Sequence, residues 1–579
     1  MKKLLIANRG EIALRIIRAC RDYGLASVAV YADADVDGLW LGHADEAFPL
    51  PGATPAATYL NGPALIAIAR RAGADAIHPG YGFLSESADF ARAVADAGLI
   101  WVGPDADTIA RLGDKIAARE IARKVGAPLV PGSDGPVSGA DDIRDFVRRH
   151  GLPVVVKAAG GGGGRGMRVI RETEDIEPLL NEARSEATTA FGNPACYVER
   201  FLDRPRHIEA QILADHHGNI AVAGLRDCSL QRRHQKLVEE APAPFLPDDL
   251  ARRITDAARA ICAEAGYTSA GTVEFLLGAD GMLSFLEVNT RLQVEHPVTE
   301  EVAGIDIVTQ QLRIAEGLAL DCPADLPARA HAIEFRINAE DPGRGFLPMP
   351  GRITRFVPPS GPGVRVDCGV DAGSTVPAAF DSLLAKLIVT GPTRAAALAR
   401  ARRALAEFRI EGIPSTLPFA RAVTEAADFN GDGPFAVHTG WIEEDFADDL
   451  AAALNRPAPD ETLLRLPAEV GGQRADLALS AAALARLARA LGTAPAAAPV
   501  PASTPGPAPA PGGLRAPGAS VLLRWLADEG AVIETGQPLA VIEAMKSEMT
   551  LHAPSAGVLR RRIAEGTELA ADDLLADLA

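Results

Sequence analysis

The feature that most constrains the fold of this chain is an internal repeat near its C-terminus. Residues 516–530 (APGASVLLRWLADEG) are echoed by residues 553–566 (APSAGVLRRRIAEG). Between the two copies, an apolar run over 538–542 leads into Glu-Ala-Met-Lys. This arrangement predicts a hairpin with Met545 and Lys546 at its tip. Two similar halves around one exposed lysine predict a small β module with pseudo-two-fold symmetry that presents this lysine.

Lysine usage points to the same residue. Of the 58 lysines and arginines in the chain, only eight are lysines. Such a composition keeps lysine chiefly where arginine cannot replace it. Lys546 is one such position, because a terminal amine can be acylated and a guanidinium group resists acylation. The alternative is an ordinary surface lysine on a β-hairpin.

Length and charge narrow the class of protein. A chain of 579 residues has room for about four domains. The net charge of −18 argues against nucleic acid and against an anionic membrane as partners. Six cysteines without a Cys-x-x-Cys pair fit a reducing compartment. The N-terminus turns polar too early for a signal peptide, and no apolar run suits a membrane span, so we expect a cytoplasmic protein.

The N-terminal part alternates apolar strands with helical stretches. Residues 4–7 form a predicted buried strand, a helix follows from about 11 to 21, and strands are predicted near 28–31 and 76–77. This pattern predicts an α/β domain with a parallel sheet. The turn at residues 8–11 lacks the Gly-x-Gly-x-x-Gly of dinucleotide-binding folds, so the domain is Rossmann-like in winding without a sign of NAD binding.

The whole chain divides into five segments. Two further α/β regions follow the first one. After them come an Ala/Leu-rich, partly helical stretch, with an amphipathic turn or two over 480–491, and a Pro/Ala-rich tether over 490–513. The predicted segments are 1–113, 114–330, 331–445, 446–513 and 514–579.

A glycine run follows the apolar strand 154–157. Five consecutive glycines, 160–164, come three residues after Lys157. Backbone N–H groups without neighbouring Cβ atoms can close around phosphate oxygens, and the loop can act as a lid. The lysine precedes the glycines, so this is not the P-loop motif. A plain linker is the alternative, but the flanking strands favour nucleotide binding. The arrangement resembles the ATP-grasp fold, in which a glycine-rich flap covers the triphosphate.

Two carboxylates are predicted to face each other on a hairpin. Apolar strands at 272–277 and 282–287 flank a possible two-residue turn at 280–281. A type I′ turn there would place Glu274 directly opposite Glu287, with Cβ atoms about 5 Å apart. Facing carboxylates repel unless a cation lies between them, so the pair suggests a Mg²⁺ site. Solvent-side acids on an open hairpin are the alternative.

From Glu287 onward, polar and mostly apolar residues alternate. Polar side chains recur at every second position, at Glu287, Asn289, Arg291, Gln293 and Glu295. An extended chain would place all five on one face, spaced about 6.6 Å apart. That face would combine metal ligands, an anion-binding guanidinium group, an amide and a possible base, which is typical of a functional site.

Together these motifs indicate a family. Residues 1–445 resemble a biotin carboxylase from end to end. The segments that carry the resemblance are 8–13, 78–86, 113–115, the glycine flap, 226–229, 231–236, 287–297 and 336–340. The C-terminal module resembles the biotin-carrier domain, whose acceptor lysine lies in Ala-Met-Lys-Met, although here Ser547 takes the last place.

The resemblance implies an α/β fold. It consists of a Rossmann-like N-terminal domain, an ATP-grasp central domain with a glycine-rich lid over about 131–203, a biotin carboxylase C-terminal domain and a small all-β biotinyl (lipoyl-like) domain.

The resemblance also implies residue roles. The ATP contacts would be Lys115, Lys157, Gly162, Gly163, Gly164, Glu199, His207, Gln231 and His234. The metal ligands would be Glu274, Glu287 and Asn289. Bicarbonate would meet Lys236, Arg291, Gln293 and the backbone of Val294, with Glu295 as the base, Arg336 facing biotin and Lys546 carrying it.

The expected chemistry accounts for these residue types. Bicarbonate must be phosphorylated by ATP before its carboxyl group can be transferred. Glu295 would deprotonate it, Arg291 would hold it by a bidentate contact, and Mg²⁺ (or Mn²⁺) with lysines would neutralise the phosphates. Arg336 would then stabilise negative charge on the ureido oxygen of biotin.

Several functions remain open at this point. The first is a ligase, the α chain of an acyl-CoA carboxylase that loads its own Lys546. A non-catalytic biotinylated scaffold and another ATP-grasp ligase are the alternatives. No residues are left for a carboxyltransferase domain, so the expected partners are a separate carboxyltransferase β subunit, a biotin protein ligase and further copies of the carboxylase half. The expected acceptor is an acyl-CoA such as acetyl- or propionyl-CoA, with pyruvate or another acid as the alternative.

Overall fold

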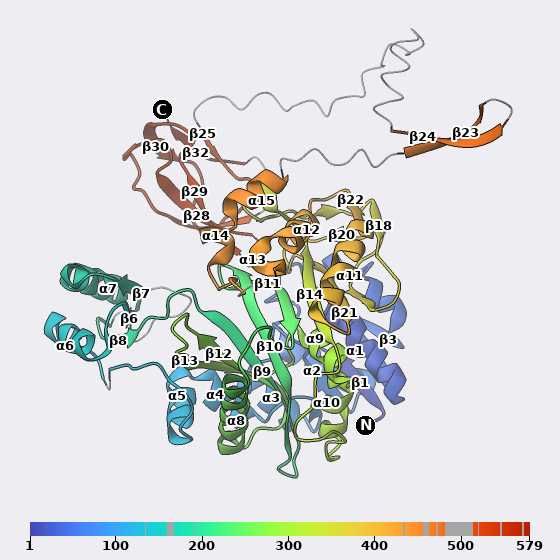
Figure 1. The fold of residues 1–579 in the computed structure, drawn as a ribbon, viewed down its shortest axis with the longest axis horizontal. Helices are drawn as coiled ribbons and strands as arrows, with labels where there is room; N and C mark the ends of the chain where they lie inside the picture. Colours follow the sequence, from blue (N-terminus) through green and yellow to red (C-terminus); the bar gives the residue numbers. More distant parts are fainter. Residues whose placement is uncertain are drawn as a thin grey trace, which may run out of the picture. The chain divides into compact units, whose positions relative to one another are not determined.

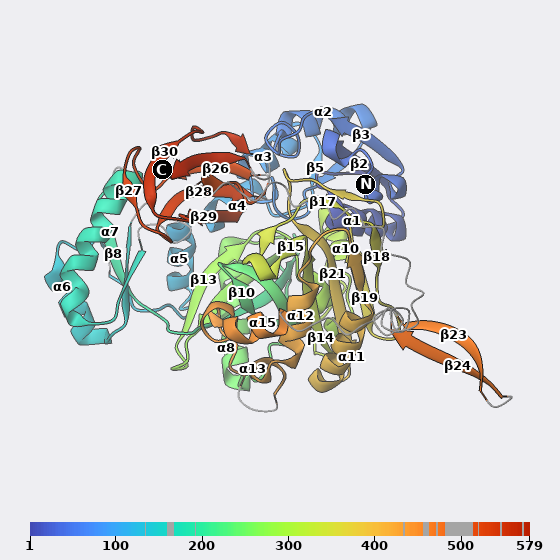
Figure 2. The same ribbon diagram turned by 90° about the horizontal axis from the view of Figure 1, so that it is seen from above.

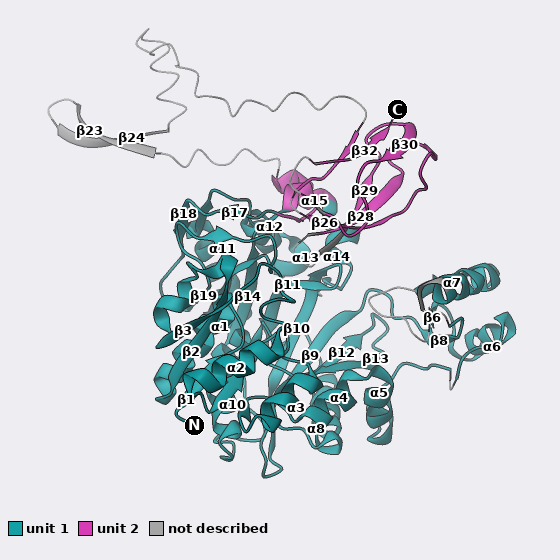
Figure 3. Ribbon diagram, turned by 180° about the vertical axis from the view of Figure 1, so that it is seen from behind, with its two compact units in different colours: residues 1–341, 349–447 teal, residues 342–348, 448–579 magenta. Residues whose placement is uncertain are grey.

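The structure consists of two compact units. One comprises residues 1–341 and 349–447, and the other comprises residues 342–348 and 448–579 (Figure 3). The computed structural model describes residues 1–133, 135–158, 167–191, 193–431, 435–454, 463–470, 473–480, 513–518, 520–544, 547–569 and 573–578. Within these ranges, no helix is long and apolar enough to cross a bilayer.

The N-terminal sheet is parallel, as the sequence predicts, with strand order β3-β2-β1-β4-β5. The central strand is buried on both faces, since Leu4 and Ile6 pack with Ile12 while Leu5 packs on the other side with Leu65. Burial on both faces explains the continuous apolar run. The elements are β1 (Lys3–Ile6), α1 (Gly10–Tyr23), β2 (Ala26–Ala32), β3 (Glu46–Leu50), α2 (Gly62–Ala72), β4 (Ala76–His78), α3 (Ala88–Asp96), β5 (Ile100–Trp101) and α4 (Ala106–Gly113).

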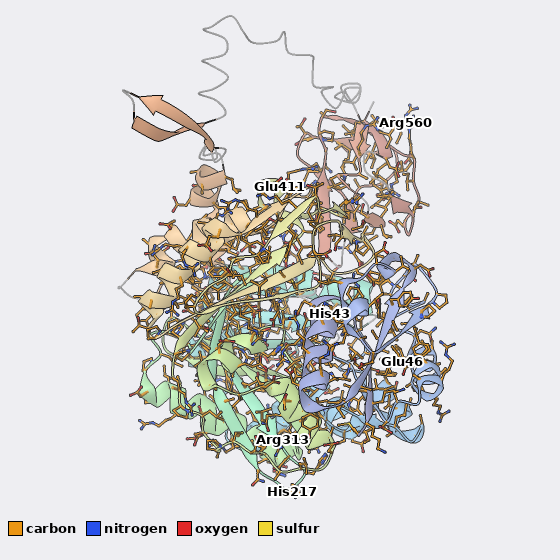
Figure 4. All side chains as sticks on the ribbon, turned by 90° about the vertical axis from the view of Figure 1, so that its right-hand side faces the viewer. His43, Glu46, His217, Arg313, Glu411 and Arg560 are labelled. Carbon is orange, nitrogen blue, oxygen red and sulfur yellow. The ribbon has the colours of Figure 1, made fainter. Side chains whose placement is uncertain are left out.

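A helix cap and two polar contacts stabilise the surface of this N-terminal region. Helix α1 ends because Gly24 adopts a left-handed conformation, with φ of 84°, and returns its N–H to the last turn. The edge strand β3 is tied to β1 by the ion pair between Lys3 and Glu46, 2.6 Å long. Arg21 donates to the backbone carbonyl of His43 at 2.8 Å. Glu46 and His43 are labelled in Figure 4.

The second sheet has eight strands in the order β13-β12-β9-β10-β11-β14-β21-β19. Its antiparallel pair β11/β14 joins a strand of the predicted segment 114–330 to a strand of the predicted segment 331–445, so these two segments share one sheet. Figure 2 shows the N-terminal sheet, in blue, on one side of β10, β14 and β21. The elements are β9 (Arg206–Ala214), β10 (Ile220–Arg232), β11 (Gln235–Ala241), α8 (Asp248–Ala265), β12 (Ser269–Leu277), β13 (Leu283–Asn289), α9 (His296–Ala303), α10 (Ile307–Ala315), β14 (His331–Asn338), β19 (Val364–Cys368), β21 (Leu383–Gly391) and α11 (Arg394–Glu407).

The predicted lid is a small α/β subdomain with its own core. Figure 1 shows its strands β6, β7 and β8 beside α6 and α7. The strand order is β7-β6-β8, and Val154 and Val156 are buried with Ile143 and Phe146 of α6. The elements are α6 (Ala140–His150), β6 (Val154–Ala158), β7 (Met167–Ile170), α7 (Ile176–Phe191) and β8 (Cys196–Arg200), and helix α5 (Lys115–Lys124) precedes them. The predicted phosphate loop, 160–164, lies outside the described residues.

Short elements complete the region up to residue 454. Gly351, at φ 158°, lies where a Cβ would meet Ile413 at 2.9 Å, so glycine suits this close approach. These elements are β15 (Glu340–Asp341), β16 (Leu347–Pro348), β17 (Gly351–Arg352), β18 (Arg355–Val357), β20 (Thr375–Val376), β22 (Arg409–Glu411), α12 (Leu417–Glu425), α13 (Ala427–Asn430), α14 (Trp441–Glu444) and α15 (Ala447–Leu454).

The C-terminal module is the predicted all-β fold. It has two four-stranded sheets, β25-β32-β30-β27 and β29-β28-β26-β31, so the two repeat copies place β26 and β30 in different sheets. Leu522 and Leu559 occupy equivalent repeat positions, and both are completely buried in the shared core. The strands are β25 (Gly513–Arg515), β26 (Ser520–Trp525), β27 (Val532–Ile533), β28 (Pro538–Ala544), β29 (Ser547–His552), β30 (Gly557–Arg561), β31 (Glu568–Leu569) and β32 (Leu574–Leu578).

The hairpin predicted around the lysine is confirmed in its strands. β28 and β29 are antiparallel, and the last pair joins Ala544 to Ser547. Met545 and Lys546, which connect these two residues in the sequence, lie outside the described residues.

The stretch before the module differs in part from its prediction. Helix α15 agrees with a partly helical stretch, but β23 (Leu463–Val470) and β24 (Gln473–Ser480) form an antiparallel hairpin that was not predicted. Leucines recur at every second position over 464–466 and 477–479, a period of two that favours strands over the helix suggested by composition. The amphipathic turns at 481–491 and most of the tether lie outside the described residues.

Candidate active site

The site is centred on the hairpin of β12 and β13. Glu274 and Glu287 lie directly opposite each other in the register, as predicted. The two-residue turn predicted at 280–281 is wrong, because β12 ends at Leu277, β13 begins at Leu283 and a longer loop joins them. A bulge next to Glu274 shifts the register by one residue and restores the predicted opposition.

The two carboxylates differ in how their charges are balanced. Burial would raise the pKa of Glu274, but Lys236 and His207, whose Nε2 lies 2.9 Å from the carboxylate, hold this pKa below its ordinary value. Burial and the charge of Glu274 raise the pKa of Glu287, whose ion pair with Lys115 is 3.8 Å long. A divalent cation would relieve this repulsion and prefers carboxylate oxygens, so the pair fits such a cation.

Asn289 completes this group of oxygen-bearing side chains. It follows Glu287 by two residues on β13, donates from Nδ2 to Glu274 at 2.8 Å and accepts at Oδ1 from Arg291 at 3.1 Å. These two hydrogen bonds fix the orientation of the Asn289 amide. The three predicted metal ligands, Glu274, Glu287 and Asn289, lie together.

The ammonium group of Lys236 joins three buried carboxylates. Its Nζ lies 2.7 Å from Glu209, 3.0 Å from Glu274 and 2.7 Å from Glu295. Burial opposes the charge, but Cys228 and the three carboxylates raise the pKa of Lys236 well above its ordinary value. Lys236 is therefore a fixed positive charge at the centre of the site.

Glu209 is a site residue that the sequence interpretation missed. It is completely buried and accepts from Nε of Arg226 at 2.5 Å. Burial would raise its pKa, but Arg226 and Lys236 lower it to about 2. The sequence carries a signal for it, because polar residues at 207, 209 and 211 alternate with apolar ones along β9 and so share one face.

Arg226 is the structural support for Glu209. Its guanidinium group is completely buried and also donates to Gln211 at 2.7 Å, to Thr299 at 2.9 Å and to Thr272 at 3.2 Å. Four acceptors from β9, β12 and α9 therefore surround this cation, which fixes the position of Glu209 beneath Lys236.

The predicted base lies on the other side of Lys236. Glu295 is completely buried, and its second oxygen, Oε2, accepts from Nη2 of Arg336 at 3.0 Å. Burial would raise the pKa of Glu295, but Lys236, Arg336 and Arg226 lower it below its ordinary value. The carboxylate is therefore ionised at neutral pH, which is the state that a base requires.

The predicted anion-binding residues also meet, although by a different geometry. β13 ends at Asn289 and α9 begins at His296, so the extended run predicted through 295 is wrong beyond residue 289. Arg291 nevertheless donates to Gln293 at 2.7 Å, and its Nε donates to Glu86 at 2.8 Å. Glu86 lies in a segment that carried the family resemblance but was given no role.

The backbone at residue 294 is held by a buried cation. Nζ of Lys386, which is completely buried, donates to the carbonyl of Val294 at 2.9 Å. The same ammonium group forms an ion pair with Glu11 at 3.1 Å. The predicted bicarbonate-facing backbone at Val294 is thus anchored from the C-terminal side of the large sheet.

Of the predicted nucleotide contacts, Lys157 and Glu199 lie in the lid subdomain and Gln231 lies on the large sheet. Lys157 and Glu199 pair at 2.7 Å within the lid subdomain, and Arg119 also contacts Glu199 at 2.9 Å. Gln231, on β10, is buried. Gly162, Gly163 and Gly164 lie outside the described residues.

His207 and His234 belong to different surroundings. His207 contacts Glu274, and its pKa is raised because this carboxylate outweighs the effect of burial. His234 lines a hollow of about 710 Å³, together with Phe201 and His438. The lining of this hollow comes from the end of the lid, from the turn between β10 and β11 and from residues 438–444, and His234 is the one predicted nucleotide contact within it.

Four family sequence models match the chain. "Biotin carboxylase, N-terminal domain" matches residues 1–109, "Carbamoyl-phosphate synthase L chain, ATP binding domain" matches 114–322, and "Biotin carboxylase C-terminal domain" matches 334–444. "Biotin-requiring enzyme" matches 507–578.

Similar proteins match over the same regions. The biotin-dependent acyl-coenzyme A carboxylase alpha3 subunit of Mycobacterium leprae is 51% identical over 588 residues, covering 100% of this chain and 98% of that protein. The biotin carboxylase of Nostoc is 50% identical and covers 76% of this chain and 98% of that one.

Solved structures resemble about three quarters of the chain. A biotin carboxylase from Campylobacter jejuni, in a β,γ-ATP complex, has a TM-score of 0.70 at 43% identity, covering 76% of this chain and 98% of that one. The biotin carboxylase domain of the Hydrogenobacter thermophilus 2-oxoglutarate carboxylase, with MgADP and bicarbonate, has a TM-score of 0.70 at 42% identity, covering 78% and 98%.

Proposed function

The chain belongs to the biotin carboxylase family of biotin-dependent carboxylases, and on this premise we propose that it carboxylates biotin carried on its own Lys546. ATP and bicarbonate are the substrates of this step. The observation that carries the proposal is the cluster around Lys236, where one ammonium group joins the predicted base, Glu295, to a predicted metal ligand, Glu274.

A divalent cation fits the residues present. Burial and the charge of Glu274 raise the pKa of Glu287, which is the strain that a cation between them relieves. Glu274, Glu287 and Asn289 would hold Mg²⁺ (or Mn²⁺), which supplies charge neutralisation for the phosphates of ATP when bound. A solved relative in complex with MgADP and bicarbonate supports this assignment.

The protein's own residues account for activation of bicarbonate. Glu295 is ionised and takes the proton of the bicarbonate O–H, so that the freed oxygen attacks the terminal phosphorus of ATP and ADP leaves. Arg291, which donates to Gln293 at 2.7 Å, would hold the anion through its guanidinium group. Lys236 lies next to the base and offsets negative charge as the phosphate is transferred.

Other cations serve the nucleotide and biotin. Lys115 and Lys157 would contact the phosphates of ATP, together with the glycines 162–164 of the lid and with Glu199, His207, Gln231 and His234 around the nucleotide. Arg336, placed between two carboxylates, would face the ureido oxygen of biotin and stabilise the negative charge that develops there.

The final acceptor is proposed to be an acyl-CoA. The Mycobacterium leprae relative that bears this substrate class in its name covers the whole chain, including the biotinyl module. A pyruvate carboxylase subunit from Methanothermobacter thermautotrophicus, at 44% identity, covers 76% of this chain, so pyruvate is the second candidate. Transfer to either acceptor would require a separate carboxyltransferase subunit, and a biotin protein ligase would load Lys546.

The test uses the full-length biotinylated chain. We expect ATP hydrolysis that depends on bicarbonate and Mg²⁺ and is stimulated by free biotin. Glu295→Gln and Arg291→Ala should each lower it by about 10² or more, the usual scale for a positioned base or charge stabiliser. Full activity in both variants would leave the non-catalytic scaffold as the better explanation. Copurification of the native complex, followed by acceptor assays, would separate acyl-CoA from pyruvate.

A further inference from the structure

Two glutamates that were given no role face each other inside the eight-stranded sheet. Glu239 on β11 pairs in register with Glu334 on β14. Directly opposite residues of an antiparallel pair have Cβ atoms about 5 Å apart. Both side chains are completely buried. They lie on the face covered by α9, because Ala332 of this face packs with Val298 and Val302.

The hydrogen bonds of this pair are incomplete. Oε1 of Glu239 accepts from Nε of Arg336 at 2.6 Å and forms an ion pair with Nη2 at 2.5 Å. Oε2 of Glu239 and both carboxylate oxygens of Glu334 have no hydrogen-bond partner among the described residues. Two ionised carboxylates in this position would be costly, because burial penalises each charge and the two charges repel.

The described groups around the pair do not supply a second donor to it. On β21, the positive charge of Lys386 lowers the pKa of Glu334, but its ammonium group donates to the carbonyl of Val294 and forms its ion pair with Glu11. Burial and nearby cations lower the pKa of His296, so its imidazole is neutral, and burial raises the pKa of the Cys228 thiol. The remaining charged groups that act on the pair are Arg336 on β14, Glu295 just before α9 and Lys236 on β11.

These charges leave one carboxylate in excess. Lys236 already balances Glu295, and Arg336 is shared between Glu295 and Glu239. Burial raises the pKa of both glutamates of the pair, and only Glu239 receives donors from a cation. Glu334 is therefore the carboxyl group that keeps a proton.

Building on the proposed function, we propose that Glu239 is a positioning residue for Arg336 in the carboxylation of biotin, and that Glu334 shares its proton with Glu239. The O–H of Glu334 then donates to the free Oε2 of Glu239. This single hydrogen bond gives a partner to Oε2 of Glu239 and to one oxygen of Glu334, and it leaves Glu239 ionised to pair with Arg336.

Two carboxylates, of Glu239 and Glu295, hold Arg336, and only Glu295 changes its charge during the reaction. When bicarbonate gives its proton to Glu295, the negative charge of Glu295 disappears and its hold on Nη2 of Arg336 weakens. Glu239 keeps its charge and continues to hold Nε and Nη2. Arg336 therefore stays in place after the base has reacted, and its Nη2 loses one of two carboxylate contacts, which leaves it able to bind the ureido oxygen of biotin.

The first test separates the two half-steps in the full-length biotinylated protein. Glu239→Gln should leave bicarbonate-dependent ATP hydrolysis without biotin within about threefold of the parent, because Glu295, Arg291 and Lys236 are untouched. Carboxylation of free biotin should fall by about tenfold or more, mainly in kcat, since Arg336 loses its charged anchor. An equal loss of both activities would overturn the positioning role.

The chain offers a matched control on the same strand. Glu240, the next residue of β11, is also buried, but it contacts His331 at 2.7 Å and Arg394 at 2.8 Å. Glu240→Gln should lower the thermal midpoint without changing the ratio of the two activities. A changed ratio in this variant would show that the readout reports stability.

The second test concerns the proton. Glu334→Gln replaces a neutral donor by a neutral donor, so carboxylation at pH 7 should stay within about threefold of the parent. The parent should lose carboxylation at alkaline pH as Glu334 ionises, and the variant should not. An infrared carbonyl band of a protonated carboxyl group should disappear in Glu334→Gln. A loss as large as that of Glu239→Gln, or a parent without this band, would overturn the shared proton.

Failure of the proposed function and failure of the positioning role give different results. If the parent protein hydrolyses no ATP with bicarbonate and carboxylates no free biotin, the proposed function itself is wrong. If the parent is active but Glu239→Gln affects both steps alike, only the role of Glu239 is wrong.

Discussion

Replacement of Lys236 by methionine tests the central charge of the site. Methionine has a similar length but no charge, so it removes an ammonium group that lies 2.7 Å from Glu295. At an effective dielectric constant of about 20, that contact corresponds to about 6 kcal/mol. Relaxation and the remaining cation Arg336 reduce the effect, and an opposite charge at this distance typically shifts a pKa by about 1–3 units.

The expected result is a loss of activity that depends on pH. In the parent protein the pKa of Glu295 lies below its ordinary value of 4.5, so the base is ionised throughout the neutral range. In Lys236→Met this pKa should rise by about 1–3 units, and protons should compete with base function near pH 6. The variant should also lose about 10²–10³ in rate at every pH, because a charge that offsets the phosphates is absent.

The assay is bicarbonate-dependent ATP hydrolysis at saturating Mg²⁺ between pH 5.5 and 8.5. The ratio of variant to parent activity should increase with pH, by up to about tenfold per pH unit at the acid end, and then level off. Lys124→Met is the matched control, because Lys124 is an exposed lysine paired with Glu264 outside the site. A ratio that stays constant with pH would refute the claim that Lys236 sets the ionisation of Glu295.

Other parts of the molecule give four further expectations. Lys546→Arg should abolish the avidin signal, because it removes the acylatable amine and keeps the charge; a signal that persists would contradict the assignment. Arg226→Met should destabilise the first unit by about 3–5 kcal/mol, measured by urea unfolding, because it leaves Glu209 buried without its guanidinium partner; a change below about 1 kcal/mol would contradict this. The pKa of Glu209 falls from 4.5 to about 2 on folding, which at about 1.36 kcal/mol per pH unit corresponds to about 3 kcal/mol of stability. This stability is present above pH 4.5 and is lost as pH falls toward 2. In Glu209→Gln the free energy of unfolding should therefore depend less on pH in this range. Deleting most of 490–513, a tether that could extend to roughly 75 Å as polyproline II, should spare biotinylation and free-biotin carboxylation but sharply lower transfer to the acceptor; wild-type transfer rates would exclude a role for this segment as a swinging arm.

The sequence predicted the fold well where local patterns and packing agree. The parallel sheet followed from a strand that is apolar on both faces, and the β module followed from a repeat whose Leu522 and Leu559 meet in one core. The opposition of Glu274 and Glu287 was correct although the assumed turn was not, because the longer loop and the bulge compensate. A strand register predicted from a turn type is correct only when any bulge and the true loop length are taken into account, and neither is visible in the sequence.

The site was only partly predictable, for a physical reason. Residues consecutive along one strand could be assigned to a shared face, which located Glu287 and Asn289. Glu209 and Glu239 reach the site from strands that are distant in the sequence, and only the pairing of β9 with β12 and of β11 with β14 brings them there. The alternation along β9 marks Glu209 as sharing a face with His207, but the partners of Glu209 and Glu239 depend on long-range strand pairing, which no local pattern specifies.

The shared eight-stranded sheet has a consequence for how this chain can be divided. A cut between residues 330 and 331 would separate β11 from β14 and expose a row of unpaired backbone N–H and C=O groups on each fragment. Neither fragment would be a self-sufficient building block, and each would tend to add strands from other molecules. Recombination between related genes should therefore preserve this junction, so that the two halves of the carboxylase are inherited together.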